Sequence, residues 1–99
     1  MAEHYASGNW HVQEGKEDEF ITRWTEFLEW TRKDHPALES ARLIRDAGDL
    51  RHFISFAMWK DPDARAAWKE SSGFAQRMGA CRQLCDEFYG SDYESAVVI

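Results

Sequence analysis

The segment His52–Trp59, HFISFAMW, constrains the fold more than any other, because a strand with this sequence is apolar on both faces. Side chains alternate along a strand, which divides these residues into one set, Phe53, Ser55, Ala57 and Trp59, and a second set, Ile54, Phe56 and Met58. A strand that is apolar on both faces lies inside a sheet whose two faces are both covered. We therefore expect helices on one face and a second subunit on the other.

The rest of the chain supplies the other elements. Apolar spacing predicts strands over residues 5–13 and 38–46, and a last strand after Gly90 in DYESAVVI. A helix is expected from Glu17 to about Lys33, since acidic residues open it and Pro36 follows it. Asp61 and Pro62 begin another helix, which breaks near residues 71–73. The helix after the break carries one stripe, Phe74, Met78, Cys81, Leu84, Cys85 and Phe88.

The order of these elements is strand, helix, strand, strand, helix pair, strand. This order is the split β-α-β arrangement of ferredoxin-like α+β folds, with a four-stranded antiparallel sheet. At 99 residues the chain is expected to form one domain over residues 1–99. Five tryptophans and six phenylalanines are many rings for one small core, so some should line a pocket or be covered by a partner subunit.

The first predicted strand has one apolar and one polar face. The polar face carries Ser7, Asn9, His11 and Gln13. If this face looks into the space between sheet and helices, Asn9 and His11 supply the polar groups of a cavity, and His11 is the preferred proton acceptor. The alternative is a face turned to solvent or to the interior of a barrel. The other histidines, His4, His35 and His52, are expected at the surface.

Charge and composition exclude several function classes. The formal charge of −6 disfavours sequence-independent binding to nucleic acid and docking on anionic membranes. We see no apolar segment long enough to span a bilayer and no export signal at the N-terminus, so the cytoplasm is the expected compartment.

A cofactor is not expected either. The chain shows no glycine-rich phosphate loop and no cluster of metal ligands, so neither a flavin nor a metal is predicted. Cys81 and Cys85 are expected on one helical face, where they pack as thiols rather than form a disulfide or a metal site.

Several segments together resemble a known family. The segments GNWHVQEGKEDEF, LIRD, FISFAMWKDP and AWKESSGF resemble the antibiotic biosynthesis monooxygenase domain family, over about residues 8–93. Pro36-Ala37 departs from the usual Pro-Gly of the family, which affects a turn and not the chemistry. The resemblance implies a ferredoxin-like domain that pairs into a dimeric α+β barrel. It implies the reaction less firmly, because the family contains cofactor-free oxygenases of polyketide phenols, haem-degrading enzymes and members without a known substrate.

The haem-degrading branch is matched incompletely. Trp68 matches its tryptophan, but Met78 stands ten residues later where that branch has its iron-ligating histidine. Asn9 lies on the matching strand one residue out of register. Haem degradation is therefore not expected, and haem binding through Met78 is kept as a third alternative.

The polyketide branch is also matched in part. Trp59 matches the tryptophan that lines its pocket, whereas Ser55 replaces an asparagine and Arg65 replaces an aromatic residue. The substrate-binding residues predicted from the sequence and the resemblance are Trp59, Trp68, Phe74, Met78 and Arg77, the last as a partner for a substrate oxyanion. Both tryptophans can equally be core residues, and Arg77 a solvated helix residue. Tyr5 and Tyr93 could also reach a cavity.

The leading hypothesis is a cofactor-independent monooxygenase that uses O2 on a small aromatic or polyketide-like phenol. His11 and Asn9 would then be its catalytic residues. The rival hypothesis is a non-catalytic homodimer that binds a small hydrophobic ligand or assists a biosynthetic enzyme.

Overall fold

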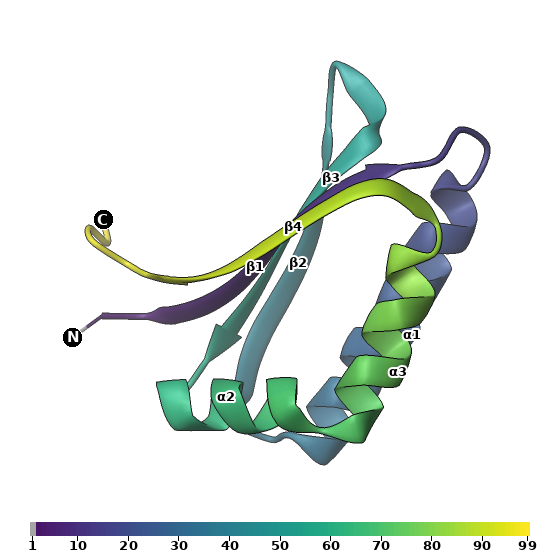
Figure 1. Cartoon of the computed structure of the whole chain (residues 1–99). Helices are drawn as coiled ribbons and strands as arrows, with labels where there is room; N and C mark the ends of the chain where they lie inside the picture. The colour runs from purple at the N-terminus through teal and green to yellow at the C-terminus, as the bar shows by residue number, and fades with distance from the viewer. Residues whose placement is uncertain (1) are drawn as a thin grey trace.

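The computed structural model describes residues 2–99 as one four-stranded antiparallel sheet with three helices on one face (Figure 1). The elements are β1 (His4–Val12), α1 (Glu17–Asp34), β2 (Leu38–Asp46), β3 (Asp49–Trp59), α2 (Pro62–Glu70), α3 (Ser72–Arg82) and β4 (Cys85–Glu94). The strand order is β2-β3-β1-β4. The predicted ferredoxin-like α+β fold is confirmed.

The two central strands have the predicted faces. The inner face carries Ala6, Gly8, Trp10 and Val12 from β1 and Phe53, Ser55, Ala57 and Trp59 from β3, all buried. In the antiparallel register Gly8 lies opposite Ser55 and Trp10 opposite Phe53. The inner face therefore alternates very small and very large side chains, and the large ones form the core beneath α1.

Helix α1 packs on this face through Phe20, Phe27, Leu28 and Thr31. The hydroxyl of Thr31 donates to the carbonyl of Phe27 at 2.8 Å and accepts from the indole nitrogen of Trp68 at 3.0 Å. Both donors are thus satisfied inside the core, which fixes Trp68 and with it the end of α2.

The break between α2 and α3 is confirmed and has a local cause. The hydroxyl of Ser71 accepts from the backbone N–H of Phe74, which caps α3, and donates to the carbonyl of Trp68. Asp61 caps α2 from the other end, where its carboxylate accepts from the N–H of Ala64 at 2.8 Å. The two helices therefore meet at an angle, with Trp68 and Phe74 on either side of the corner.

The prediction for the C-terminal third was wrong in one respect. The helix ends at Arg82 rather than continuing through Phe88, and β4 begins at Cys85 rather than after Gly90. The physical reason is pairing. Residues 85–94 satisfy the free backbone edge of β1, and Phe88 packs on Trp10 with ring centroids 4.3 Å apart.

Cys81 and Cys85 consequently belong to different elements, not to one helical face. Both are free thiols, as predicted, and Cys85 donates to the carbonyl of Cys81 at 3.5 Å. Burial raises the pKa of Cys81 to about 12 and that of Cys85 to about 11. The pair is therefore protonated near neutral pH and acts as apolar packing.

In the part of the chain that the structure describes, no helix covers the second face of the sheet (Figure 1). Large side chains stand exposed on it, among them Ile44, Phe56, Tyr89 and Tyr93. Within residues 2–99, no helix is both long and apolar enough to cross a membrane.

The inner face depends on Gly8 being a glycine. A Cβ at this position would lie 2.6 Å from the indole nitrogen of Trp10 and 2.9 Å from the hydroxyl of Ser55. We expect Gly8→Ala to lower the free energy of unfolding by about 1–3 kcal/mol, the usual cost of overpacking. Urea denaturation measures it. Gly79→Ala is the matched control, because nothing lies within 4 Å of a Cβ there and alanine favours a helix. Equal stability of the two variants would contradict the packing described.

Candidate ligand cavity

A cavity of about 330 Å³ lies between the inner face of the sheet and the three helices. Its floor consists of the small residues Ala6, Gly8, Ser55, Ala57 and Gly90. The helices rest on the large core side chains instead and so do not reach this part of the sheet. The volume is at the lower end of the range for small-molecule sites, about 300–1,000 Å³.

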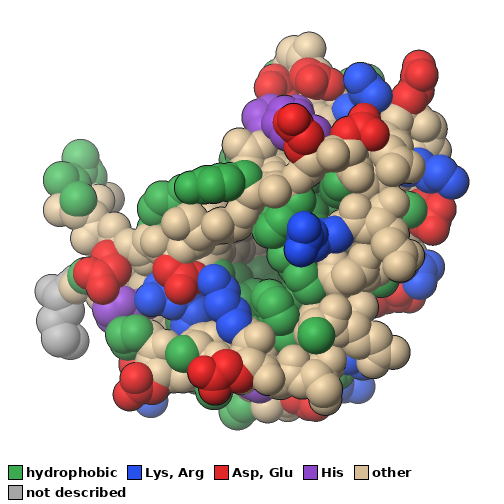
Figure 2. Space-filling model, in the orientation of Figure 1, with side chains coloured by type: hydrophobic (Ala, Val, Ile, Leu, Met, Phe, Trp, Pro, Cys, Tyr) green, Lys and Arg blue, Asp and Glu red, His purple; other side chains and the backbone are tan. Residues whose placement is uncertain are grey.

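Aromatic rings form the walls. They include Trp10, Trp24, Phe27, Trp68, Phe74 and Phe88, and Met78 completes the set. Trp68 stacks on Phe27 with centroids 5.6 Å apart, and Phe74 meets Trp68 edge-on at 4.7 Å. Figure 2 shows the hollow beside α3, with hydrophobic side chains inside it and basic side chains at its rim. Flat aromatic walls of this kind suit a planar aromatic ligand.

The charged groups that line the cavity are both basic. Lys69 comes from α2, and Arg82 from the end of α3 lies with its guanidinium 5.4 Å from the ring centre of Phe88. The lining contains no Asp, Glu or His among residues 2–99. Positive charge beside an apolar wall favours a ligand that carries negative charge.

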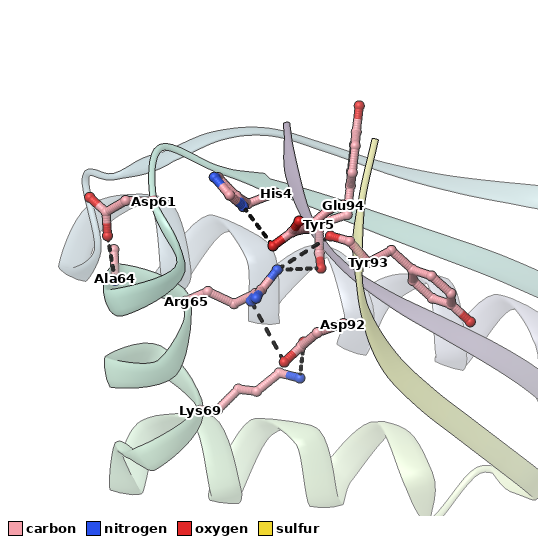
Figure 3. Close-up of polar contacts among 9 residues, drawn as sticks. All are labelled: His4, Tyr5, Asp61, Ala64, Arg65, Lys69, Asp92, Tyr93 and Glu94. Carbon is pink, nitrogen blue, oxygen red and sulfur yellow. Dashed lines mark hydrogen bonds and ion pairs between the residues drawn. The ribbon is translucent and has the colours of Figure 1, made fainter. Parts of the chain in front are cut away.

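A polar cluster holds α2 against the ends of β1 and β4 at one side of the cavity (Figure 3). Arg65 donates to the carbonyl of Tyr5 at 2.9 Å and to that of Tyr93 at 3.4 Å. Its guanidinium also lies 3.6 Å from the carboxylate of Asp92, which Lys69 contacts as well. The cluster thus positions the Lys69 side of the cavity while part of the charge of Lys69 is neutralised.

The structure brings three of the predicted substrate-binding residues to the cavity, Trp68, Phe74 and Met78. Trp59 is not part of the lining, because it lies behind Trp68, with ring centroids 4.9 Å apart. Arg77 points elsewhere: its guanidinium covers the ring of Trp30 at 4.3 Å and donates to the carbonyl of Gly73. Of the two tryptophans that border the strand-to-helix corner, one is core and one is a cavity wall.

Two alternatives were open for the polar face of β1, and the one that places His11 and Asn9 in this cavity was wrong. Strand alternation puts Gly8, Trp10 and Val12 inward, so His11 and Asn9 lie on the open face of the sheet. There His52 bonds to the Asn9 side-chain oxygen at 2.8 Å and to Asp46 at 3.0 Å, and His11 stacks on His52 at 4.5 Å. The hydrogen bond from His52, followed by that from the N–H of Gly48, lowers the pKa of the Asp46 carboxyl. His52 is half-buried, not the exposed residue expected.

Several groups at the cavity, among them Ser55, Lys69 and Arg82, were not predicted as site residues. Ser55 was noted as an interruption of the apolar face of β3 and as the replacement of an asparagine, but not as a site residue, although a hydroxyl within such a face is itself a signal. Arg82 was placed inside a longer helix, where nothing in the sequence separates it from a solvated arginine. Among residues 2–99 no group of three or more His, Cys, Asp or Glu side chains is arranged to hold a metal ion.

Comparison with known proteins agrees with this architecture. The sequence profile of the antibiotic biosynthesis monooxygenase family matches residues 4–79. No curated protein sequence matches the chain. SnoaB from Streptomyces nogalater, described as a cofactor-independent oxygenase, is similar in structure, with a TM-score of 0.88 and 18% identity over 100% of this chain and 98% of its own.

Two further solved structures have the same fold. A conserved protein from Methanosarcina mazei Go1 has a TM-score of 0.83 at 17% identity, with 94% of this chain and 92% of that chain covered. A conserved protein of unknown function from Bacteroides thetaiotaomicron has a TM-score of 0.79 at 17% identity, covering 95% and 97%. Likeness at these identities establishes the fold and leaves the chemistry to the site itself.

The wall formed by Trp68 depends on Thr31. We expect Thr31→Val to lower the free energy of unfolding by about 1–3 kcal/mol, because the buried indole N–H of Trp68 loses its acceptor. Chemical denaturation measures the change, and near-ultraviolet circular dichroism reports the environment of the ring. Thr25→Val is the control, since the exposed Thr25 makes the same helical bond, to Ile21, without a second partner. Equal effects of the two variants would show that Trp68 does not depend on this bond.

Proposed function

The chain belongs to the antibiotic biosynthesis monooxygenase family, and from this premise we propose that it is a cofactor-independent monooxygenase of a small aromatic or polyketide-like phenol. The observation that carries the proposal is the cavity, which combines aromatic walls with two basic groups and, among residues 2–99, has no carboxylate in its lining. The description of SnoaB as a cofactor-independent oxygenase supports the same reaction type.

Binding would place the substrate ring against the aromatic walls. Trp68 and Phe74 lie on one side and Trp10 with Phe88 on the other, so a planar molecule contacts ring faces and edges. The guanidinium of Arg82 would stabilise the ionised hydroxyl and so lower the pKa of the bound phenol. The protein thereby raises the concentration of the electron-rich anion near neutral pH.

The bound anion then reacts with O2. One electron passes from the anion to O2, which gives a substrate radical and superoxide. The two combine to form a carbon–oxygen bond, and the resulting hydroperoxide loses water to leave a carbonyl group. A ring CH2 and O2 have then become C=O and H2O. The chain contributes charge stabilisation by Arg82 and exclusion of water by the aromatic walls.

His11 and Asn9 are not required by this proposal, because neither reaches the cavity. Their catalytic role remains a prediction. In the proposed reaction the proton of an acidic phenol leaves through the mouth of the cavity to water, since among residues 2–99 no Asp, Glu or His lines it.

A second copy of the chain is the proposed cover of the open sheet face. Two adjoining hollows on this face, of about 460 and 350 Å³, share Phe56 and Tyr93 in their lining. Phe56 of β3 and Tyr89 and Tyr93 of β4 are exposed there, on either side of β1, and such a group of exposed rings is typical of a protein–protein interface. We therefore propose a homodimer that forms by stacking of the two sheets.

The alternative is a non-catalytic protein that binds a small hydrophobic ligand. Among residues 2–99 no Asp, Glu or His lines the cavity, which favours this alternative because such a cavity can bind an acidic ligand without removing its proton. Oxygen consumption separates the two functions.

Arg82 is the residue that tests the reaction. With 1,8-dihydroxyanthrone as substrate, we expect oxygen uptake above the autoxidation background, and Arg82→Gln should lower kcat/KM by about tenfold. Arg77→Gln is the matched control, on the same helix but outside the cavity. His11→Gln tests the predicted catalytic role of His11, and we expect no change in kcat/KM. Ligand binding without any oxygen uptake would support the non-catalytic alternative. A large loss of kcat/KM in His11→Gln would indicate that the reaction takes place on the open face of the sheet.

If the homodimer forms through the open face, a charge introduced on that face should weaken the dimer. Ile44 is 50% exposed on β2 and faces away from the helices. We expect Ile44→Glu to shift the protein from dimer to monomer without lowering monomer stability, because a buried charge would oppose sheet stacking. Analytical ultracentrifugation measures the shift. Thr22→Glu, which adds the same charge on the exposed side of α1, should leave the dimer intact. A wild-type monomer at all concentrations tested would contradict the proposal.

A further inference from the structure

The floor of the cavity contains one hydroxyl whose hydrogen-bonding direction is fixed by a neighbour. We propose that Ser55 determines substrate specificity by donating a hydrogen bond to an acceptor oxygen at the buried end of the ligand. The ligand class is then a flat aromatic molecule with a carbonyl or similar acceptor at its deep end. The inference rests on the proposed function only in taking this cavity as the substrate site.

The hydrogen bond from Trp10 fixes the direction in which the Ser55 hydroxyl can donate. The indole Nε1 of Trp10 lies 3.0 Å from the Ser55 Oγ, and both groups are buried. An indole nitrogen can only donate, so Ser55 accepts from it and keeps its own proton free. Ser55 makes no other side-chain hydrogen bond within residues 2–99.

The cavity is the place where this proton can be used. Ser55 lines the floor of the cavity together with Gly8, its partner on β1. A buried hydroxyl proton without an acceptor is unfavourable, and a ligand oxygen would remove that cost. A hydrogen bond received from Trp10 also polarises the hydroxyl, which makes it a better donor and a poorer acceptor. The site therefore favours an acceptor on the ligand over a donor of the same shape.

The arrangement is rigid because Trp10 cannot turn away. Its ring packs between Phe20, at a centroid distance of 5.1 Å, and Phe88, at 4.3 Å. Gly8 leaves the space through which the indole reaches the next strand, since a Cβ there would lie 2.6 Å from Nε1. Trp10 is thus a positioning residue that acts through Ser55.

The opposite end of the ligand would meet a different group. Arg82 is exposed at the rim, whereas Ser55 is only 7% exposed on the floor. A ligand oriented by both would have its acceptor oxygen inside and its acidic group towards the mouth. This orientation distinguishes the proposed class from aromatic hydrocarbons and from amines, which offer no acceptor of this kind.

Two soluble tricyclic probes test the inference. Anthraquinone-2-sulfonate carries carbonyl acceptors and an anionic end, and anthracene-2-sulfonate has the same outline without the carbonyls. In isothermal titration calorimetry we expect the quinone to bind the wild-type protein about tenfold more tightly, the difference that one hydrogen bond makes. Ser55→Ala should bring the ratio of the two dissociation constants close to one. Ser91→Ala removes a hydroxyl from the neighbouring strand β4, at a position paired with Ser7 whose side chain is turned to the open face, and should leave the ratio unchanged.

The outcomes separate this inference from the proposed function. Equal binding of the two probes by the wild-type protein, or binding of neither, would overturn the role of Ser55 whether or not the variant folds. An unchanged ratio in Ser55→Ala would overturn it too. Neither measurement involves turnover, so a protein that selects the quinone but consumes no oxygen would contradict only the monooxygenase.

Discussion

The alternation of very small and very large side chains on the inner face of the sheet is the constraint on which the rest of the structure depends. Trp10, Phe53 and Trp59 fill the space beneath the helices, and Gly8, Ser55 and Ala57 between them leave it empty. Helices that rest on the large residues cannot also reach the small ones, because side-chain lengths set the distance between sheet and helix. The cavity is therefore a direct product of strand periodicity, and the same residues that stabilise the core define its walls.

Most of the fold could be predicted from the sequence, and the exception has a clear cause. α1, β2 and the start of α2 lie where periodicity and caps put them, because acidic residues, Pro36, Asp61 and Pro62 mark their ends locally. The boundary between α3 and β4 has no such mark. Cys81, Leu84, Cys85 and Phe88 keep helical spacing across it, so only pairing with β1, a long-range effect, decides that a strand begins there.

The candidate site could be predicted only in part, because it too depends on long-range packing. Periodicity showed that His11 and Trp10 face opposite ways, but it did not show which of the two faces the helices would cover. Residues 59 and 68 are both tryptophans, and only the packing shows that Trp59 lies behind Trp68. Arg65 stands where the polyketide branch has an aromatic residue, and only the structure explains this replacement. Its guanidinium donates to the carbonyls of Tyr5 and Tyr93 and holds α2 in place.

The sheet separates two different chemical environments, and this separation bears on mechanism. The titratable side chains Asp46, His52 and His11 gather on the open face, while the helix-covered face has rings, hydroxyls and two basic groups. The proposed reaction would therefore proceed without an Asp, Glu or His base in the cavity lining, as far as residues 2–99 are concerned, and it would need a ligand acidic enough for positive charge to hold it as an anion. Electron-rich phenols that ionise readily meet this requirement, and simple aliphatic alcohols do not. The charge distribution of the lining thus restricts the substrate as strongly as its shape does.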